Sequence, residues 1–318
     1  MYKILIEVPT WLGDCVMTTP AIENIVNLHP DADITIFGSA VSIKVFKHHP
    51  NVKHIVVDES KQHQNRVFHL YKQVKQLGEF DCAISFRRTL ASKLFVWFAE
   101  ATIKGNYKRH TKQAIHQVIR YNDFVNKTFK ANTIASQLTI YKSLVPFKVI
   151  KSDKKLLGIN PGASYGSAKR WYPEEFAKVA SELSHQYDIV IFGGPGEADI
   201  ALDIEKSLLE KGVKNYQNLA GKTAIPELIN RISNLNLFIT GDSGPMHVAA
   251  AFQVPTVAIF GPTKDKETSQ WMNKKGIIVK SNIDCQPCME RTCPLKHHNC
   301  MRLIKAQNVL NAVFKNLN

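Results

Sequence analysis

Short apolar runs alternate with amphipathic stretches along most of the chain. In the first half, the strand-like runs are Lys3–Val8, Ile34–Phe37, Ile55–Val57 and Ala83–Phe86. In the second half they are Leu156–Ile159, Asp188–Phe192, Leu237–Thr240 and Thr256–Phe260. Apolar residues at helical spacing lie between these runs, over Val16–Leu28, Arg66–Leu77, Pro173–Gln186, Ala198–Lys211 and Ile225–Asn234. Strands that alternate with helices predict an α/β fold with doubly wound parallel sheets.

The pattern starts again after a lysine-rich stretch, Pro146–Lys155, which is the best candidate for a linker. A chain of 318 residues is long enough for two domains, each with its own core. We therefore predict one Rossmann-like domain over residues 1–150 and a second over residues 151–318. The last helix of the chain is a candidate to pack back on the N-terminal domain.

Composition narrows the class of protein. Hydrophobic residues make up 44% of the chain and charged residues 21%, which excludes a disordered or fibrous protein. The longest apolar stretches, such as Leu94–Ala99, are far shorter than the roughly 20 residues that cross a bilayer. Met1 leads directly into the strand-like Tyr2–Val8 without a signal-peptide pattern, so we expect a cytoplasmic protein.

The net charge of +14 points to an anionic partner, and it is concentrated in the first half of the chain. Between Arg87 and Lys148 there are twelve Lys or Arg residues and two acidic residues. From Lys151 onward, 21 basic residues are balanced by 16 acidic ones. A solvated basic surface that aids solubility is the alternative explanation. No nucleic-acid-binding motif accompanies the charge, so we do not expect a nucleic acid partner.

Ligands of doubly wound sheets bind beyond the carboxyl ends of the strands, so the loops after the strands are the candidate sites. The polar and glycine-rich loops among them are Pro9–Cys15, Asn160–Trp171, Gly193–Asp199 and Gly241–His247. The chain has no G-x-x-x-x-G-K-[ST] sequence, and its G-P-G string lacks the third glycine of the dinucleotide motif. A P-loop NTPase is therefore disfavoured, and an NAD enzyme has only weak support.

Asp14 follows Gly13 in the first of these loops, just before a predicted helix. A carboxylate in that place could act as general base and take the proton of an attacking hydroxyl. The same carboxylate could instead cap the helix, and spacing alone favours the capping role.

The loop Asn160–Trp171 contains small residues, the hydroxyls of Ser164 and Ser167, and the pair Lys169-Arg170. Small residues expose backbone amides, hydroxyls add donors, and Lys169 can neutralise phosphate charge. These groups would stabilise a departing diphosphate. An ordinary β–α loop is the alternative, although most such loops have only about 2–6 residues.

Two further loops place acidic residues beside glycines. Glu197 could accept hydrogen bonds from ribose hydroxyls or simply begin a helix. Ser243 and Gly244 begin a predicted helix whose amides would receive a phosphate. Asp242 would orient this loop, and His247 would either point at the same site or pack in the core. The G-D-S-G string also occurs in serine proteases, but the β–α context and the residue order exclude that class.

Four of the six cysteines lie close together near the end of the chain: Cys285, Cys288, Cys293 and Cys300, with His297 and His298 between the last two. The C-x2-C spacing is typical of structural zinc or iron–sulfur sites, but the later spacings fit no standard knuckle. A cytosolic location argues against disulfides. Reduced thiols are the favoured interpretation and a metal site is the alternative.

Several strings of the chain occur together in one known family. They are W-L-G-D-x-x-x-x-T-P, N-P-G-A-S-Y-G-S-A-K-R-W, F-G-G-P-G-E, N-L-A-G-K-T, G-D-S-G-P-M-H-V-A-A-A and C-x-P-C-x4-C-P-x2-H-H-x-C-M. With them the chain resembles the bacterial lipopolysaccharide heptosyltransferases of glycosyltransferase family 9. The resemblance spans nearly the whole chain and is densest from Asn160 to Pro262, and about Lys44 to Val145 carries no matching motif. The string A-S-Y-G-S-A-K-R-W is most similar to heptosyltransferase II.

The resemblance implies a fold and a role for each matching residue. The fold would be GT-B, with two Rossmann-like domains that face a cleft, the first binding the acceptor and the second the nucleotide sugar. Asp14, beside Gly13, would be the general base, and Lys169 would stabilise the departing diphosphate. The other donor-binding residues would be Ser164, Ser167, Glu197, Asp242, Ser243, Gly244 and His247.

The implied activity is an inverting, metal-independent transfer of heptose from ADP-heptose to the first inner-core heptose of lipopolysaccharide or lipooligosaccharide, without a cofactor. The implied partners are ADP-heptose, a lipid-anchored core oligosaccharide and the anionic inner face of the inner membrane, where the enzyme would be peripheral. The alternatives are heptosyltransferase I acting on Kdo-lipid A, another GT-B sugar-nucleotide enzyme, and a nucleotide- or nucleic-acid-binding protein.

Overall fold

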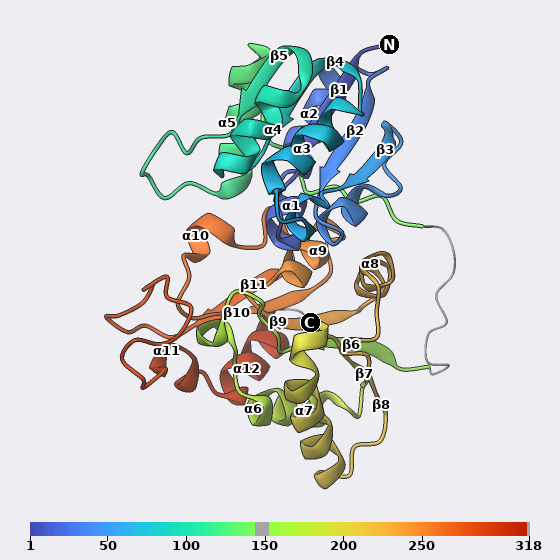
Figure 1. The fold of residues 1–318 in the computed structure, drawn as a ribbon. Coiled ribbons are helices and arrows are strands. Elements are labelled where there is room, and N and C mark those ends of the chain that lie inside the picture. The colour runs from blue at the N-terminus through green and yellow to red at the C-terminus, as the bar shows by residue number, and fades with distance from the viewer. Residues whose placement is uncertain (144–152, 317–318) are drawn as a thin grey trace. The chain divides into compact units, whose positions relative to one another are not determined.

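The computed structural model describes residues 1–143 and 153–316. The chain divides into two compact units, Met1–Ser143 and Leu144–Asn318 (Figure 1). Each unit is an α/β unit built on a parallel sheet, which confirms the predicted fold class. The predicted boundary between residues 150 and 151 and most of the predicted linker Pro146–Lys155 lie outside the described residues.

The N-terminal unit has a parallel sheet with the strand order β3-β2-β1-β4-β5. The strands are β1 (Lys3–Glu7), β2 (Asp33–Gly38), β3 (Val52–Val57), β4 (Glu79–Ser85) and β5 (Glu100–Asn106). The chain runs outward from β1 to β3 and then returns to β4, so the direction of winding reverses between β1 and β4. Open α/β sheets bind their ligands at such a switch point. The segment that contains Asp14 leaves the sheet there, after β1.

Helices cover both faces of this sheet. They are α1 (Leu12–Met17), α2 (Thr19–Leu28), α3 (Arg66–Lys75), α4 (Leu90–Phe98) and α5 (Gln117–Phe129), with short 3₁₀ turns η1 (Ser42–Phe46) and η2 (Ser60–Gln62). On one face, Leu70 of α3 and Phe95 of α4 pack in one cluster with Leu5 of β1. Elsewhere α2 packs against α5.

The predicted helix Val16–Leu28 is wrong in one respect, because two helices, α1 and α2, take its place. Pro20 has no N–H to donate to the carbonyl of Val16, four residues earlier. The hydroxyl of Thr19 donates to that carbonyl instead, at 2.9 Å. Thr18 ends α1 and begins α2, and its own hydroxyl donates to the carbonyl of Cys15 at 2.7 Å.

The C-terminal unit has a parallel sheet with the order β11-β10-β9-β6-β7-β8. The strands are β6 (Lys155–Asn160), β7 (Tyr187–Ile191), β8 (Tyr216–Asn218), β9 (Leu237–Gly241), β10 (Thr256–Phe260) and β11 (Gly276–Lys280). The winding reverses between β6 and β9, so the loops after these two strands flank the switch point. The predicted phosphate-binding residues lie in those loops.

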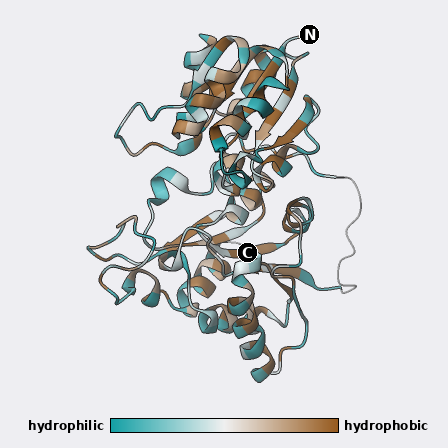
Figure 2. Cartoon of the chain, in the orientation of Figure 1, coloured by the Kyte–Doolittle hydropathy of each residue, from teal (hydrophilic) through white to brown (hydrophobic). Residues whose placement is uncertain are grey.

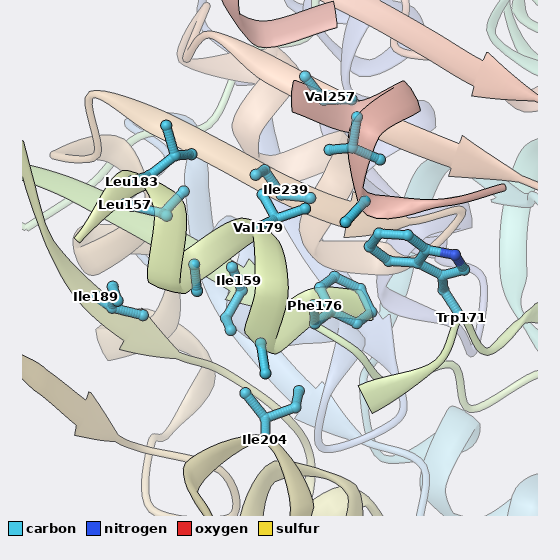
Figure 3. Close-up of a cluster of buried hydrophobic side chains, with 14 of the residues drawn as sticks. Leu157, Ile159, Trp171, Phe176, Val179, Leu183, Ile189, Ile204, Ile239 and Val257 are labelled. Carbon is cyan, nitrogen blue, oxygen red and sulfur yellow. The ribbon is translucent and has the colours of Figure 1, made fainter. Parts of the chain in front are cut away.

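The helices of this unit are α6 (Pro173–Leu183), α7 (Ala198–Glu210), α8 (Ile225–Ser233), α9 (Gly244–Ala251), α10 (Asp265–Thr268), α11 (Asn299–Arg302) and α12 (Ala306–Asn316). The 3₁₀ turns are η3 (Ser167–Lys169) and η4 (Pro195–Glu197). Ile159 and Val257 pack in the larger core cluster with Phe176 of α6 (Figure 3). Phe260 of β10 belongs to a separate cluster with Met246 of α9. Both faces of the sheet are therefore covered by apolar packing, as parallel sheets require.

The helices carry both apolar and polar residues (Figure 2). Within residues 1–143 and 153–316, no helix combines the length and the apolar content needed to cross a membrane.

Glu175 in the first turn of α6 anchors the last helix. Its Oε2 accepts the backbone N–H of Ala306, the first residue of α12, at 2.7 Å, and its Oε1 lies 2.8 Å from Nζ of Lys178. Burial by itself would raise the pKa of Glu175, but the bonds to Lys178 and Ala306 hold it below its ordinary value. α12 packs against α6, β10 and β11 of its own unit. Its packing on the N-terminal domain stays a prediction.

We expect Glu175→Gln to lower the free energy of unfolding by about 1–2 kcal/mol, because it removes a charged acceptor at the start of α12. The folded-state pKa of Glu175 is depressed, so its contribution to folding stability is fully present at pH values above the unfolded-state pKa of about 4.3. This contribution is lost as the pH falls through the folded-state pKa. Urea unfolding at pH 7 and at pH 3.5 measures both effects. The exposed Glu174→Gln in the same turn is the control. An equal loss at both pH values would contradict the assignment.

Candidate active site

An ion pair joins the two loops that leave the switch point of the C-terminal sheet. Lys169, in the loop after β6, places Nζ 2.6 Å from Oδ2 of Asp242, in the loop after β9. The same ammonium donates to the backbone carbonyl of Asp242 at 3.3 Å. The side chains are only 13% and 6% exposed, so water screens their attraction less than it would at the surface. Two residues that the sequence assigned to the donor site are thus in direct contact.

A third loop reaches the same carboxylate. Thr263, after β10, donates its hydroxyl to Oδ2 of Asp242 at 2.6 Å. Asp242 therefore accepts hydrogen bonds from Lys169 and Thr263 and holds the ammonium in place. Thr263 was not predicted. Its signal is its position in G-P-T, directly after a predicted strand.

Helix α9 begins next to this ion pair. Ser243 occupies the N-cap position, and Gly244 is the first helical residue. The Ser243 hydroxyl is 3.0 Å from that of Thr240 and accepts from Nδ2 of Asn160 at 3.4 Å, so it is turned toward the strand ends. The positive end of the helix dipole and its first-turn amides thus lie close to the Lys169 ammonium, which suits an anion. His247 is buried, one turn into α9.

Glu197 brings a fourth loop, the one after β7, to the loop after β6. Its Oε2 accepts the backbone N–H of Gly194 at 2.7 Å, and the side chain is buried. A Cβ on Gly162 would overlap the Glu197 carboxylate, so only glycine allows this approach. The predicted ribose-binding residue is therefore next to the predicted phosphate loop.

The serines of the long loop are placed differently from Lys169. Ser164 and Ser167 are exposed. Between them, Tyr165 donates its hydroxyl to the carbonyl of Met289 at 2.6 Å. The Lys169 ammonium is 4.8 Å from the centre of the Tyr165 ring, which is the geometry of a cation–π contact.

The cysteine-rich segment supports the backbone of the same loop. Ala168 donates its N–H to the carbonyl of Arg291 at 3.0 Å, and its own carbonyl is 2.9 Å from Nε2 of His298. A Cβ on Gly166 would overlap the Arg291 carbonyl, so a glycine is needed at this contact. The second ring nitrogen of His298 lies 3.1 Å from the hydroxyl of Tyr172. Sequence reasoning did not predict this support, because about 120 residues separate the two segments.

All six cysteines are free thiols. Cys285, Cys288, Cys293 and Cys300 line one small cavity beside Ala168. Burial, and then the neighbouring cysteines, raise the pKa of Cys300 to about 11, so this residue is a neutral thiol at pH 7. Among the residues that the structure describes, no group of three or more His, Cys, Asp or Glu side chains could hold a metal ion as they stand.

In the N-terminal unit, Asp14 lies inside the first turn of α1, and Trp11 takes the N-cap position. The capping role that spacing favoured for Asp14 is therefore wrong. Gly13 directly precedes it in the helix. Burial, and then the charge of Asp14, raise the pKa of Tyr121. A carboxylate in a first helical turn is stabilised by the helix dipole.

A buried charge network lies at the carboxyl end of the N-terminal sheet, where the segment with Asp14 leaves β1. The sequence did not predict it. Arg87, after β4, places Nη1 2.7 Å from Oε1 of Glu7 at the end of β1, and Ser85 donates its hydroxyl to the other carboxylate oxygen. Burial raises the pKa of Glu7, and the Arg87 charge opposes that effect. Arg87 and the buried Arg120 therefore do not belong to the basic surface that the charge count indicated, and Lys148 lies outside the described residues.

The chain is similar to known glycosyltransferases over nearly its whole length. A family model described as glycosyltransferase family 9 (heptosyltransferase) matches residues 67–299. Lipooligosaccharide heptosyltransferase 2 of Campylobacter jejuni is 39% identical over 327 residues, which cover 99% of this chain and 98% of that protein. Lipopolysaccharide heptosyltransferase 2 of Escherichia coli is 23% identical over 304 residues, 87% of each chain.

Solved structures share the fold. The structure of E. coli ADP-heptose LPS heptosyltransferase II gives a TM-score of 0.81 at 22% identity and covers 99% of this chain and 98% of that one. E. coli heptosyltransferase WaaC with ADP gives a TM-score of 0.78 at 15% identity and covers 99% of each chain. With the family match over most of its length and a relative 39% identical from end to end, the chain belongs to glycosyltransferase family 9, the heptosyltransferases.

Proposed function

We propose that the chain is heptosyltransferase II, which transfers heptose from ADP-heptose to the first inner-core heptose of lipopolysaccharide or lipooligosaccharide. The observation that carries the proposal is the position of the Lys169 ammonium, which Asp242 holds where α9 begins. The near-full-length similarity to C. jejuni lipooligosaccharide heptosyltransferase 2 supports the choice of this activity among those of the family.

In the proposed donor complex, the diphosphate of ADP-heptose lies against Lys169, Ser243 and Gly244. Asp242, which also accepts from Thr263, already holds the ammonium in position, so little reorganisation is needed when negative charge develops on the departing ADP. No cofactor takes part in this scheme. The remaining contacts to the donor come from Ser164, Ser167, Glu197, Asp242 and His247, with Glu197 toward the ribose.

The proposed reaction is one inverting displacement at the anomeric carbon of the heptose. The bond from that carbon to the β-phosphate oxygen breaks while the bond to the acceptor hydroxyl oxygen forms. Asp14 takes the hydroxyl proton, and Gly13 lets the acceptor approach. The position of Asp14 in the first turn of α1 supports this role, because the helix dipole stabilises the ionised carboxylate.

We infer that the enzyme works in the cytoplasm as a peripheral protein at the inner face of the inner membrane. Its acceptor is a lipid-anchored oligosaccharide with phosphate and carboxylate groups. The net charge of +14 supports an anionic partner of this kind. Nucleic acid is not an expected partner.

Asp14→Asn should reduce kcat by about 100- to 10,000-fold, because the amide cannot accept the hydroxyl proton, while the KM for ADP-heptose changes little. The assay follows ADP release with a purified core acceptor that ends in the first heptose. Asp31→Asn, an exposed turn residue of the same unit, is the matched control. Near-wild-type transfer by Asp14→Asn would refute the assignment of the base.

Lys169→Ala should lower kcat by about 100- to 1,000-fold, because the charge of the departing diphosphate is no longer compensated. The variant also leaves the buried Asp242 carboxylate without its cation, so a thermal melt must show that it is folded at the assay temperature. Lys206→Ala, an exposed lysine on α7, is the control. Unchanged kinetics in Lys169→Ala would remove this residue from the donor site.

ADP should raise the melting temperature of the protein, whereas UDP and GDP at the same concentration should not. A ligand at 100 times its Kd stabilises the folded state by about 2.7 kcal/mol, which a thermal-shift assay resolves easily. Stabilisation by UDP alone would overturn the ADP-sugar donor and favour another GT-B sugar-nucleotide enzyme.

A further inference from the structure

Helix α4 exposes apolar side chains on the side away from its own core. Leu90 is 72% exposed and Trp97 is 71% exposed, whereas Phe95 and Val96 between them are buried. Residues seven apart lie on one side of a helix, so Leu90 and Trp97 share a face. Leaving a tryptophan in water forfeits one of the largest burial energies of any side chain. This face of α4 is therefore a candidate for a partner.

Helix α3 extends the same surface, because α3 and α4 lie side by side (Figure 1). Its exposed apolar residues are Val67, Phe68 and Tyr71. The rings of Tyr71 and Trp97 both contact Phe98, each with its centre 5.2 Å from that ring. The apolar residues of the two helices are thus neighbours in space.

Lysines lie among these apolar residues. Nζ of Lys72 is 4.6 Å from the centre of the Phe68 ring, and Nζ of Lys75 is 5.9 Å from that of Tyr71. Lys93 is exposed on α4 between Leu90 and Trp97. Lys75 is neutralised by Glu100, through a 2.6 Å contact, whereas Lys72 and Lys93 have no acidic ion-pair partner among residues 1–143 and 153–316. The surface therefore combines aromatic and aliphatic side chains with unbalanced positive charge.

We propose that this surface, the α3–α4 face, docks the enzyme on an anionic phospholipid membrane. Trp and Tyr side chains favour the level of the lipid headgroups, and lysines beside them are attracted to anionic headgroups. The proposal rests on the proposed function, since a lipid-anchored acceptor is reached only at a membrane. It goes beyond net charge, because it assigns the contact to two helices and gives the apolar residues a part in it.

Helix α7 offers the contrasting case within the same chain. It exposes Leu202 and Leu209 to a similar degree, but it carries Asp199, Asp203, Glu205 and Glu210 against the single lysine Lys206. An anionic membrane would repel this helix. Removing its leucines is therefore a matched control for removing Leu90 and Trp97.

The test is co-sedimentation of the full chain with vesicles of phosphatidylglycerol and phosphatidylethanolamine, compared with vesicles of phosphatidylcholine. We expect the wild type to bind only the anionic vesicles. It should dissociate from them in about 0.5 M salt, because salt at this concentration screens charges that are more than a few ångströms apart. Leu90→Ser with Trp97→Ser should weaken binding at least about tenfold. Lys72→Gln with Lys93→Gln should weaken it by about fivefold per lysine.

The controls are Leu202→Ser with Leu209→Ser, and Lys274→Gln with Lys275→Gln, which should bind as the wild type does. Transfer to a deacylated, water-soluble acceptor should be unchanged in the Leu90/Trp97 variant, and this readout separates docking from catalysis. If the chain were not a heptosyltransferase, transfer would fail while vesicle binding could still be measured. Wild-type vesicle binding by the Leu90/Trp97 variant would overturn the proposal. The proposal would also be overturned if the wild type formed a dimer and the Leu90/Trp97 variant dissociated that dimer without any change in vesicle binding.

Discussion

The ion pair between Lys169 and Asp242 turns three separate loops into one site. Strand order brings the loops after β6, β9 and β10 to one edge of the sheet, but it does not orient their side chains. Asp242 does so, because its carboxylate accepts from both Lys169 and Thr263. A lysine held in this way costs little further entropy when it meets a diphosphate, whereas a solvated lysine would have to be ordered.

The backbone of the lysine loop depends on a segment far away in the sequence. Arg291 and His298 bond to the two backbone groups of Ala168, next to Lys169, and Gly166 leaves room for the Arg291 carbonyl. The cysteine-rich segment thus supports the loop that carries Lys169, whatever the role of its thiols.

Sequence patterns located the interior strands and, of the four edge strands, only part of β3. β1, β6, β9 and β10 are buried and were predicted within about two residues, whereas β5, β8 and β11 are edge strands that lack a fully buried apolar run. The residues of the candidate site also fall into those that local sequence predicts and those that it does not. Lys169 and Asp242 were predicted because each follows a strand in a recognisable string. Thr263 and Arg291 were not, because their contacts depend on tertiary packing rather than on spacing.

A structure of the protein with bound ADP tests the central claim most directly. The account predicts that the β-phosphate lies within hydrogen-bond distance of Lys169 Nζ and of the first-turn amides of α9, with the ribose toward Glu197. It also predicts that the Lys169–Asp242 contact persists in the complex. A diphosphate bound away from Lys169 and α9 would contradict the account, even if the protein transferred heptose.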